Sequence, residues 1–148
     1  MTTSDSPSPS SPAQERESLR LTIAEHPARG KLGGAWWPQS RDIDLEFAAL
    51  VEEFPALQGR VMRGLFSRPD WDTAPRKVAT HRGFVKVGSF PNDDTHLMIL
   101  TVSAEPWRLQ LLVVPSDATA DKARALMAAA ASVDVAGAKA LLVEHGVL

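Results

Sequence analysis

The chain has 148 residues, of which 44% are hydrophobic and 23% are charged, the composition of an ordinary globular domain. It contains no cysteine, which excludes disulfides, thiolate metal sites and cysteine nucleophiles. The formal net charge is -2, and basic and acidic side chains are equal in number beyond residue 18. Because phosphate binding relies on clustered Lys and Arg, we expect neither nucleic acid nor a membrane as a partner.

Residues 1–18 are rich in Ser, Pro and Thr and contain no large apolar side chain after Met1. Such a segment buries too little apolar surface to offset its ordering entropy, so we expect a disordered tail. Residues 19–148 are then predicted to form a single domain. The sequence shows neither a basic stretch followed by an apolar leader nor about 18 consecutive apolar residues, so we expect a soluble, cytoplasmic protein.

The folded part opens with alternating apolar and polar side chains over residues 19–23, the pattern of a strand with one buried face. Further along, large apolar side chains recur at steps of three and four: Ile43, Phe47, Leu50 and Phe54. This spacing predicts an amphipathic helix that ends at Pro55. Its acidic residues lie mostly on the other side: Asp44, Glu46, Glu52 and Glu53.

From Gly59 onward the sequence reads as strands separated by short loops. The predicted strands are residues 60–67, 77–81, 84–90, 97–103 and 108–114. Short connections favour antiparallel neighbours, so we expect a meander. The last two strands are almost entirely apolar, which indicates that both of their faces are covered and that they lie at the centre of the sheet.

Two helices are predicted after the last strand. The first, over residues 121–132, is rich in alanine, and its small side chains allow it to lie close to a sheet. The second runs from about Val135 to Glu144. The predicted fold is therefore α+β: a mainly antiparallel sheet of about five to six strands, with one helix after the first strand and two C-terminal helices packed on it.

Residues 33–42 hold two of the four tryptophans, two glycines, a proline and a pair of opposite charges. In a structural interpretation, the glycines allow close backbone approach and one tryptophan enters the core. Pro38 then stiffens the entry into the following helix. Ser40 or Asp42 caps that helix by accepting hydrogen bonds from its first turn.

The same segment also fits a binding surface. Trp36 and Trp37 are neighbours in the chain, so their side chains diverge and we expect one of them to stay partly available. Arg41 presents a planar guanidinium that suits a carboxylate or a phosphate near the positive end of a helix. Both interpretations stay open, because the sequence does not show which side chains are buried.

Residues 34–42 read G-A-W-W-P-Q-S-R-D. With this run the chain resembles an uncharacterised actinobacterial family, a domain of unknown function. Members of that family carry G-A-W-W-P-x-S-R-D near the start of the folded part. Trp71, His96 ahead of L-M-I-L, and L-L-V-V-P at residues 111–115 follow in the order that such proteins show. The resemblance covers residues 19–142. It implies a single domain and brings no established activity, ligand or catalytic residue.

Single residues elsewhere in the chain are further candidates. His96 lies where a loop meets an apolar strand and can serve as a general base beside Asp93 or Asp94, or as a hydrogen-bonded loop residue. Trp71 lies between two aspartates and can stack on a planar ligand or cap the open edge of the core. Trp107 precedes the last strand and is interpreted as covering a sheet edge.

The sequence contains no hydrolase elbow, phosphate loop or dinucleotide fingerprint, and its histidines lack metal-ligand spacing, so we expect no metal and no cofactor. We expect a non-catalytic module in which the segment around Arg41 contacts a small molecule or a protein. The alternative is a small enzyme that joins Arg41 and Asp42 to His96. The candidate binding residues are Trp36, Trp37, Arg41, Asp42, Trp71 and His96. Monomer and homodimer both stay open.

Overall fold

The structure is a computed structural model that describes residues 18–26, 28–90, 95–104, 108–131 and 133–148. Its strands are β1 (Leu21–Ile23), β2 (Gly34–Trp36), β3 (Val61–Ser67), β4 (Lys77–Thr80), β5 (Gly83–Phe90), β6 (Leu97–Val102) and β7 (Leu109–Val113). Its helices are α1 (Ile43–Glu53), α2 (Ala120–Ala130) and α3 (Ala138–Glu144), with 3-10 turns η3 (Ala56–Gln58), η4 (Arg68–Asp70) and η5 (Val135–Gly137). The predicted tail, Trp107, Asp93 and Asp94 lie outside the described residues, Ser18 excepted.

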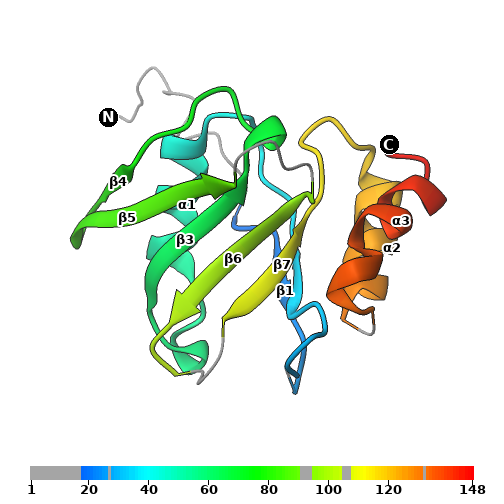
Figure 1. Cartoon of the computed structure of the whole chain (residues 1–148), viewed down its shortest axis with the longest axis horizontal. Helices are drawn as coiled ribbons and strands as arrows, with labels where there is room; N and C mark the ends of the chain where they lie inside the picture. The colour runs from blue at the N-terminus through cyan, green and yellow to red at the C-terminus, as the bar shows by residue number, and fades with distance from the viewer. Residues whose placement is uncertain (1–17, 27, 91–94, 105–107, 132) are drawn as a thin grey trace, which may run out of the picture.

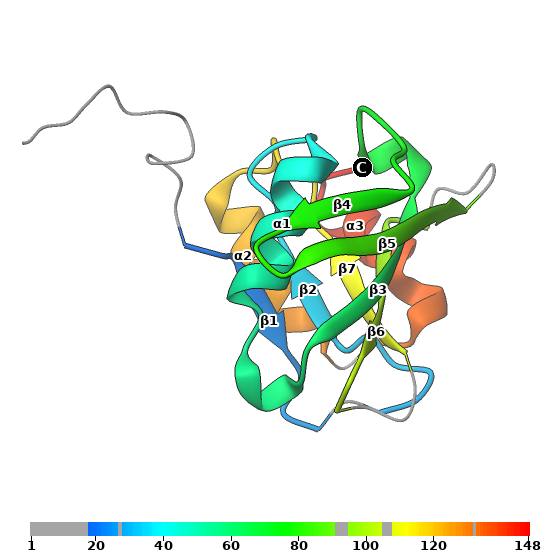
Figure 2. The ribbon, with the colours of Figure 1, turned by 90° about the vertical axis from the view of Figure 1, so that its left-hand side faces the viewer.

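The described strands form one seven-stranded sheet in the order β1-β2-β7-β6-β3-β5-β4, which Figure 2 shows in succession. Two neighbouring pairs are parallel, β2 with β7 and β3 with β5, and the other pairs are antiparallel. The protein is α+β, but the prediction of a mainly antiparallel sheet of five to six strands is wrong. The meander is also wrong, because β5 inserts between β3 and β4 instead of pairing with β6.

The error comes from one strand and one connection. The three-residue strand β2 lies inside the glycine- and tryptophan-rich run, where a strand pattern is too short to read. The return of β5 to β3 depends on contacts distant in sequence, and local patterns do not encode them. The predicted central place of the last two strands is confirmed, since β7 and β6 are third and fourth in the sheet.

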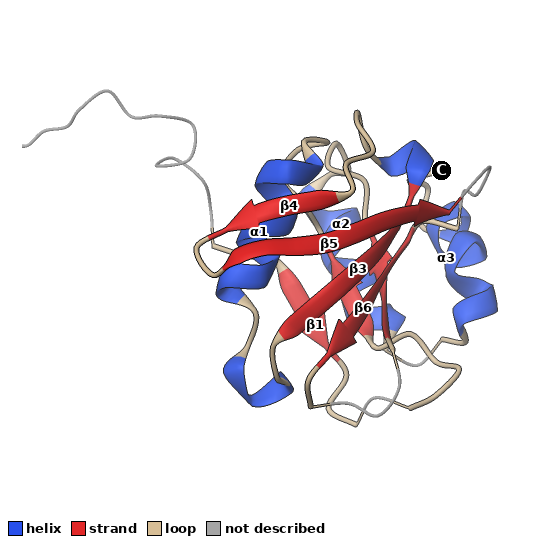
Figure 3. Ribbon diagram, turned by 60° about the vertical axis from the view of Figure 1, so that its left-hand side comes forward, coloured by secondary structure: helices blue, strands red, loops and turns tan. Residues whose placement is uncertain are grey.

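The helices cover the two faces of the sheet unequally. α1 lies on one face and α3 on the opposite face (Figure 3), so the sheet separates two apolar cores. The α1-side core contains Phe47, Phe66 and Met98, and the α2–α3-side core contains Leu97, Leu112 and Leu126. In Figure 1, α2 and α3 lie beside the half of the sheet that contains β1 and β7, while β3 and β5 carry α1 behind them and no described helix in front.

The two cores explain why both adjacent tryptophans are buried. Successive side chains of an extended segment point to opposite faces, and here both faces are covered. Trp36, 1% exposed, enters the α1-side core, and Trp37, 9% exposed, enters the α2–α3-side core. Trp36 is thus fully buried, and Trp37 keeps only a narrow exposed edge. Gly34 permits this placement, because a Cβ at its positive φ of 145° would collide with the carbonyl oxygen of Thr22 in β1.

Helix α1 begins as predicted, with Asp42 as its cap: the Leu45 amide donates to Oδ1 of Asp42 over 3.3 Å. The helical pattern placed Glu46 on the exposed polar side of α1, but Glu46 is only 1% exposed. Its carboxylate turns back toward the loop before the helix and accepts hydrogen bonds there. Among the described residues, no helix is long and apolar enough to cross a membrane.

Candidate functional site

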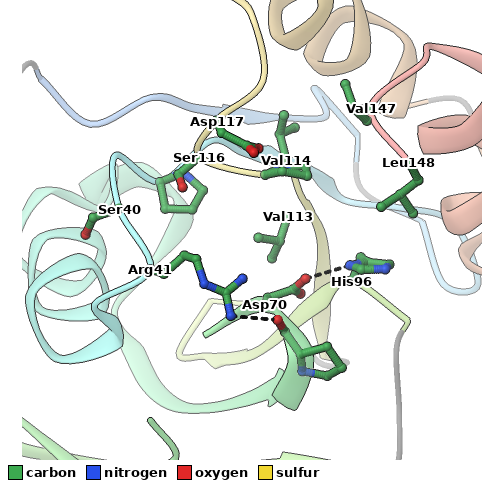
Figure 4. Close-up of a pocket in the computed structure, with 13 residues that line it drawn as sticks. Ser40, Arg41, Asp70, His96, Val113, Val114, Ser116, Asp117, Val147 and Leu148 are labelled. Carbon is green, nitrogen blue, oxygen red and sulfur yellow. Dashed lines mark hydrogen bonds and ion pairs between the residues drawn. The ribbon is translucent and has the colours of Figure 1, made fainter. Parts of the chain in front are cut away.

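Several loops meet at one edge of the sheet. β2 runs parallel to β7, and both β3 and β7 are antiparallel to β6, so β2, β3 and β7 all end at the same edge. A pocket of about 360 Å³ lies there, a volume suited to a small molecule. The segments that line it follow β2 (Pro38, Ser40, Arg41), β3 (Pro69, Asp70) and β7 (residues 114–117), and include Val113, His96, Val147 and Leu148 (Figure 4).

A part-buried His–Asp pair forms part of the pocket wall. Nδ1 of His96 lies 2.6 Å from Oδ1 of Asp70, and the two side chains are 12% and 9% exposed. A carboxylate only accepts hydrogen bonds, so the pairing assigns the proton to Nδ1. In the neutral ring, Nε2 then carries a lone pair and acts as an acceptor. Asp70 thus fixes both the orientation and the tautomer of His96.

The backbone of His96 is held in an unusual conformation. With φ at 59° it is the one residue other than glycine, among those the structure describes, that has a positive φ. A side chain bearing a Cβ adopts this left-handed region at some cost, and such residues concentrate at functional sites. The carbonyl of His96 is tied to β7, because the Val113 amide donates to it over 2.8 Å. This anchor directs the imidazole toward Asp70.

The pair leaves hydrogen-bonding capacity unused. Oδ2 of Asp70 is buried and has no partner among the described residues. The described residues likewise provide no hydrogen bond to Nε2 of His96, whose ring is bonded through Nδ1 alone. Buried polar atoms in native proteins are nearly always paired, so the unpaired Oδ2 of Asp70 beside a pocket calls for a functional explanation.

Arg41 lies at the rim of the pocket and joins two of its loops. Its Nε donates to Oδ1 of Asp72 over 2.9 Å, and its Nη2 donates to the carbonyl of Pro69 over 3.0 Å. The Asp72 amide returns a hydrogen bond to the Arg41 carbonyl over 3.1 Å. The side chain is half exposed, and Figure 4 shows its guanidinium reaching toward Asp70. The planar group is therefore held in place by the loop that carries Asp70.

Glu46 holds the loop that carries Arg41. Its Oε1 accepts from the Gln39 amide over 2.9 Å, and its Oε2 accepts from the Ser40 hydroxyl over 2.6 Å. Hydrogen bonds to a buried carboxylate are short and strong, so the loop is fixed to helix α1. The hydroxyl of Ser40 is occupied by this contact and is not free to act as a nucleophile.

The structure brings together two of the six predicted site residues. Arg41 and His96 line one pocket, whereas Asp42 caps α1. Trp36 and Trp71 lie in the α1-side core, whereas Trp37 keeps an exposed edge that lines a second pocket of about 410 Å³. Trp71 is 1% exposed and packs against Trp36 with ring centroids 5.5 Å apart.

Trp37 is covered on its outer side by a basic side chain. The guanidinium carbon of Arg20 lies 3.6 Å from the centre of the Trp37 ring. Nε and Nη2 of Arg20 also donate to the carbonyls of Trp37 and Pro38, over 3.0 and 2.9 Å. These contacts hold the run after β2 in place.

Asp70 is the site residue that sequence reasoning missed. His96 was paired with Asp93 or Asp94 because they are near in sequence, but its carboxylate comes from the end of β3, 26 residues earlier. The sequence places Asp70 in a polar turn shortly after a strand, but nothing in that pattern links it to His96. Across the described residues, no group of three His, Asp or Glu side chains gathers to hold a metal ion.

The described residues thus form a mixed α+β sheet with helices on both faces and a pocket beyond the ends of β2, β3 and β7. The chain belongs to the Family of unknown function (DUF5994), whose model matches residues 19–130. The predicted membership of a family of unknown function is confirmed. Neither a curated protein nor a solved structure matches the chain.

Proposed function

We propose that the protein binds a small polar molecule in the pocket between Arg41 and His96. The observation that carries this proposal is the part-buried His96–Asp70 pair in the wall of a pocket of about 360 Å³, where Oδ2 of Asp70 has no partner among the described residues. The protein is thus still proposed to be a non-catalytic binding module, as the sequence predicted. The proposed binding site, however, is the pocket and not the tryptophans. Arg41 is common to both versions.

The side chains around the pocket indicate the chemistry of the ligand. Nε2 of His96 accepts a hydrogen bond, so the ligand offers a hydroxyl or an N–H group. Arg41 has N–H groups beyond the two used by Asp72 and Pro69, and these suit a carbonyl or a carboxylate. Val113, Leu148 and several prolines provide apolar wall. We therefore expect a compact molecule with a hydrogen-bond donor, a carbonyl-type acceptor and an apolar body.

Native mass spectrometry of the protein purified from its own host tests this proposal. The wild-type protein is expected to retain an additional mass, and His96→Asn is expected to lower its occupancy about tenfold, as loss of one good hydrogen bond to the ligand implies. Asn is chosen because it adopts positive φ more readily than other residues. The matched control is His26→Asn in an exposed loop.

A second pair of variants tests whether Arg41 at the pocket rim acts through its position or only through its charge. Arg41→Gln is expected to weaken retention, whereas Arg29→Gln, an exposed arginine away from the pocket, is expected to leave it unchanged. Equal retention in wild type, Arg41→Gln and His96→Asn would contradict the proposal. So would a wild-type protein that carries no additional mass under gentle purification.

A catalytic function is the second candidate, and the 2.6 Å contact between His96 and Asp70 favours it. A histidine with its tautomer fixed by a carboxylate can take a proton from a ligand hydroxyl or a water at Nε2. Asp42, which the sequence interpretation included, has no part in this version because it caps α1.

The variant Asp70→Asn tests this second candidate. The new amide donates to Nδ1, moves the ring proton to Nε2 and removes the base. If the retained molecule is converted over time in wild type, Asp70→Asn is expected to slow the conversion by about 10²- to 10⁴-fold. A retained molecule that stays unchanged for hours in the wild-type protein would leave binding as the function.

We also propose a cytoplasmic location, an actinobacterial origin, and G-A-W-W-P-x-S-R-D at residues 34–42 as a signature of the family. The roles of these residues support the signature: the glycine admits β1, the tryptophans fill both cores, and Arg41 borders the pocket. Family members in which these positions vary freely would contradict it. Fractionation of the host cells checks the location.

A further inference from the structure

One half of the sheet has an uncovered face. β3, β5 and β4 pack on α1 with one side, and on the other side no described helix lies over them (Figure 1). The alternation along β5 identifies this second side, because Val85 and Val87 pack in the α1-side core. Phe84 and Lys86 therefore point to the uncovered face. We call this surface the open face.

Three cations lie side by side across the open face. The strand register aligns Lys77 of β4 with Lys86 of β5, Lys86 with Arg63 of β3, and Arg63 with Thr101 of β6. Neighbouring strands are about 4.8 Å apart, so the three cations form one continuous row. All three side chains are exposed.

Among the described residues, the row has no acidic counterpart on its own strands. The strands β3, β4, β5 and β6 contain no Asp or Glu at any position, and no ion pair joins Lys77, Lys86 or Arg63 to a described residue. Like charges directly opposite each other on neighbouring strands destabilise a sheet. A row of this kind suits an anionic partner that neutralises it.

An exposed aromatic ring lies beside the row. Phe84 is 66% exposed, and Nζ of Lys77 lies 4.3 Å from the centre of its ring. The register places Phe84 opposite Ala79, one step along the open face from the pair of Lys77 and Lys86. Phe84 and Lys77 thus place an aromatic ring and a cation together on the open face.

We propose that the open face binds single-stranded nucleic acid, with phosphates on the row Lys77, Lys86 and Arg63 and a base stacked on Phe84. Cations that follow the backbone and an aromatic ring that receives a base are the combination that binds single strands on uncovered sheets. The ring of Phe84 gives a lipid bilayer little apolar surface to bury, whereas stacking one base requires one ring. The sequence did not predict this row, because the total charge is near neutral and the three cations are separated in sequence.

Fluorescence anisotropy with labelled oligo(dT) and oligo(U) of about 12 nucleotides tests the proposal. Wild type is expected to bind in about 50 mM salt, and more weakly as salt rises. Lys86→Glu is expected to weaken binding about tenfold and to lower the salt slope by about 0.7, the value for one phosphate contact of a single strand. Phe84→Ala is expected to weaken binding by about 5- to 150-fold.

The matched control is Arg29→Glu, which makes the same charge change at an exposed position outside the open face and is expected to bind like wild type. Because Lys86 and Phe84 are exposed, circular dichroism is expected to show both variants folded. Equal weakening by Arg29→Glu and Lys86→Glu would overturn the proposal. Failure of wild type to bind either oligonucleotide at about 100 µM protein would also overturn it, as would binding only to vesicles containing phosphatidylserine.

Discussion

The two halves of the sheet differ in how they are covered, and their side chains differ accordingly. β2 and β7 have helices or loops on both faces, and every residue of β2 is buried. β3, β5 and β4 have one covered face, and on the other face Arg63, Lys77 and Lys86 are exposed. Both candidate sites lie where helices no longer cover the sheet. One is the pocket beyond the strand ends, and the other is the cation row on the open face.

The largest expected effect on stability comes from a substitution in the half of the sheet that is covered on both faces. Trp36→Ala removes a fully buried ring between α1 and the sheet and is expected to lower the free energy of unfolding by about 3–5 kcal/mol. Phe84→Ala removes a ring of similar kind from the open face and is expected to cost less than about 1 kcal/mol. Urea unfolding of both variants measures this contrast. Similar losses would contradict the assignment of the two faces.

An intermediate effect is expected at the link between α1 and the pocket. Glu46→Ala leaves the Gln39 amide and the Ser40 hydroxyl without their acceptor and is expected to cost about 1–3 kcal/mol. Asp44→Ala, an exposed position of the same helix, is the control and is expected to cost less than about 1 kcal/mol. Thermal unfolding compares them, and equal stability would show that Glu46 does not hold the loop.

The smallest expected effect has the opposite sign. Lys86→Glu replaces two like-charge neighbours with two opposite-charge neighbours, so it is expected to raise the free energy of unfolding by about 0.2–1 kcal/mol. The gain is expected to shrink in about 1 M salt, where surface charges are screened. Chemical unfolding at low and high salt measures it. A loss of stability at low salt would mean that the row has an acidic partner.

Local patterns in the sequence predicted the helices and most strands, because their apolar residues repeat at clear periods. They did not reveal β2, which is three residues long, or the parallel return of β5 to β3. Glu46 was assigned to the exposed side of α1, since a helical pattern does not show that a loop folds back over it.

The sites were predictable only in part. Arg41 and His96 drew attention through residue type and position, and they do line one pocket. The contact between Asp70 and His96 was not predictable, because the two residues are 26 positions apart in sequence and the strand order brings them together. The cation row depends on register between three strands, so counting charges along the chain gave a neutral surface where the fold gathers positive charge.

The most direct test of the pocket is a crystal structure of the protein purified from its own host, with any retained molecule in place. We predict density beside Nε2 of His96 that also contacts the guanidinium of Arg41, with Nδ1 of His96 still bonded to Asp70. An unoccupied pocket in a protein that carries a retained mass, or density bound on another surface, would contradict the proposed ligand site.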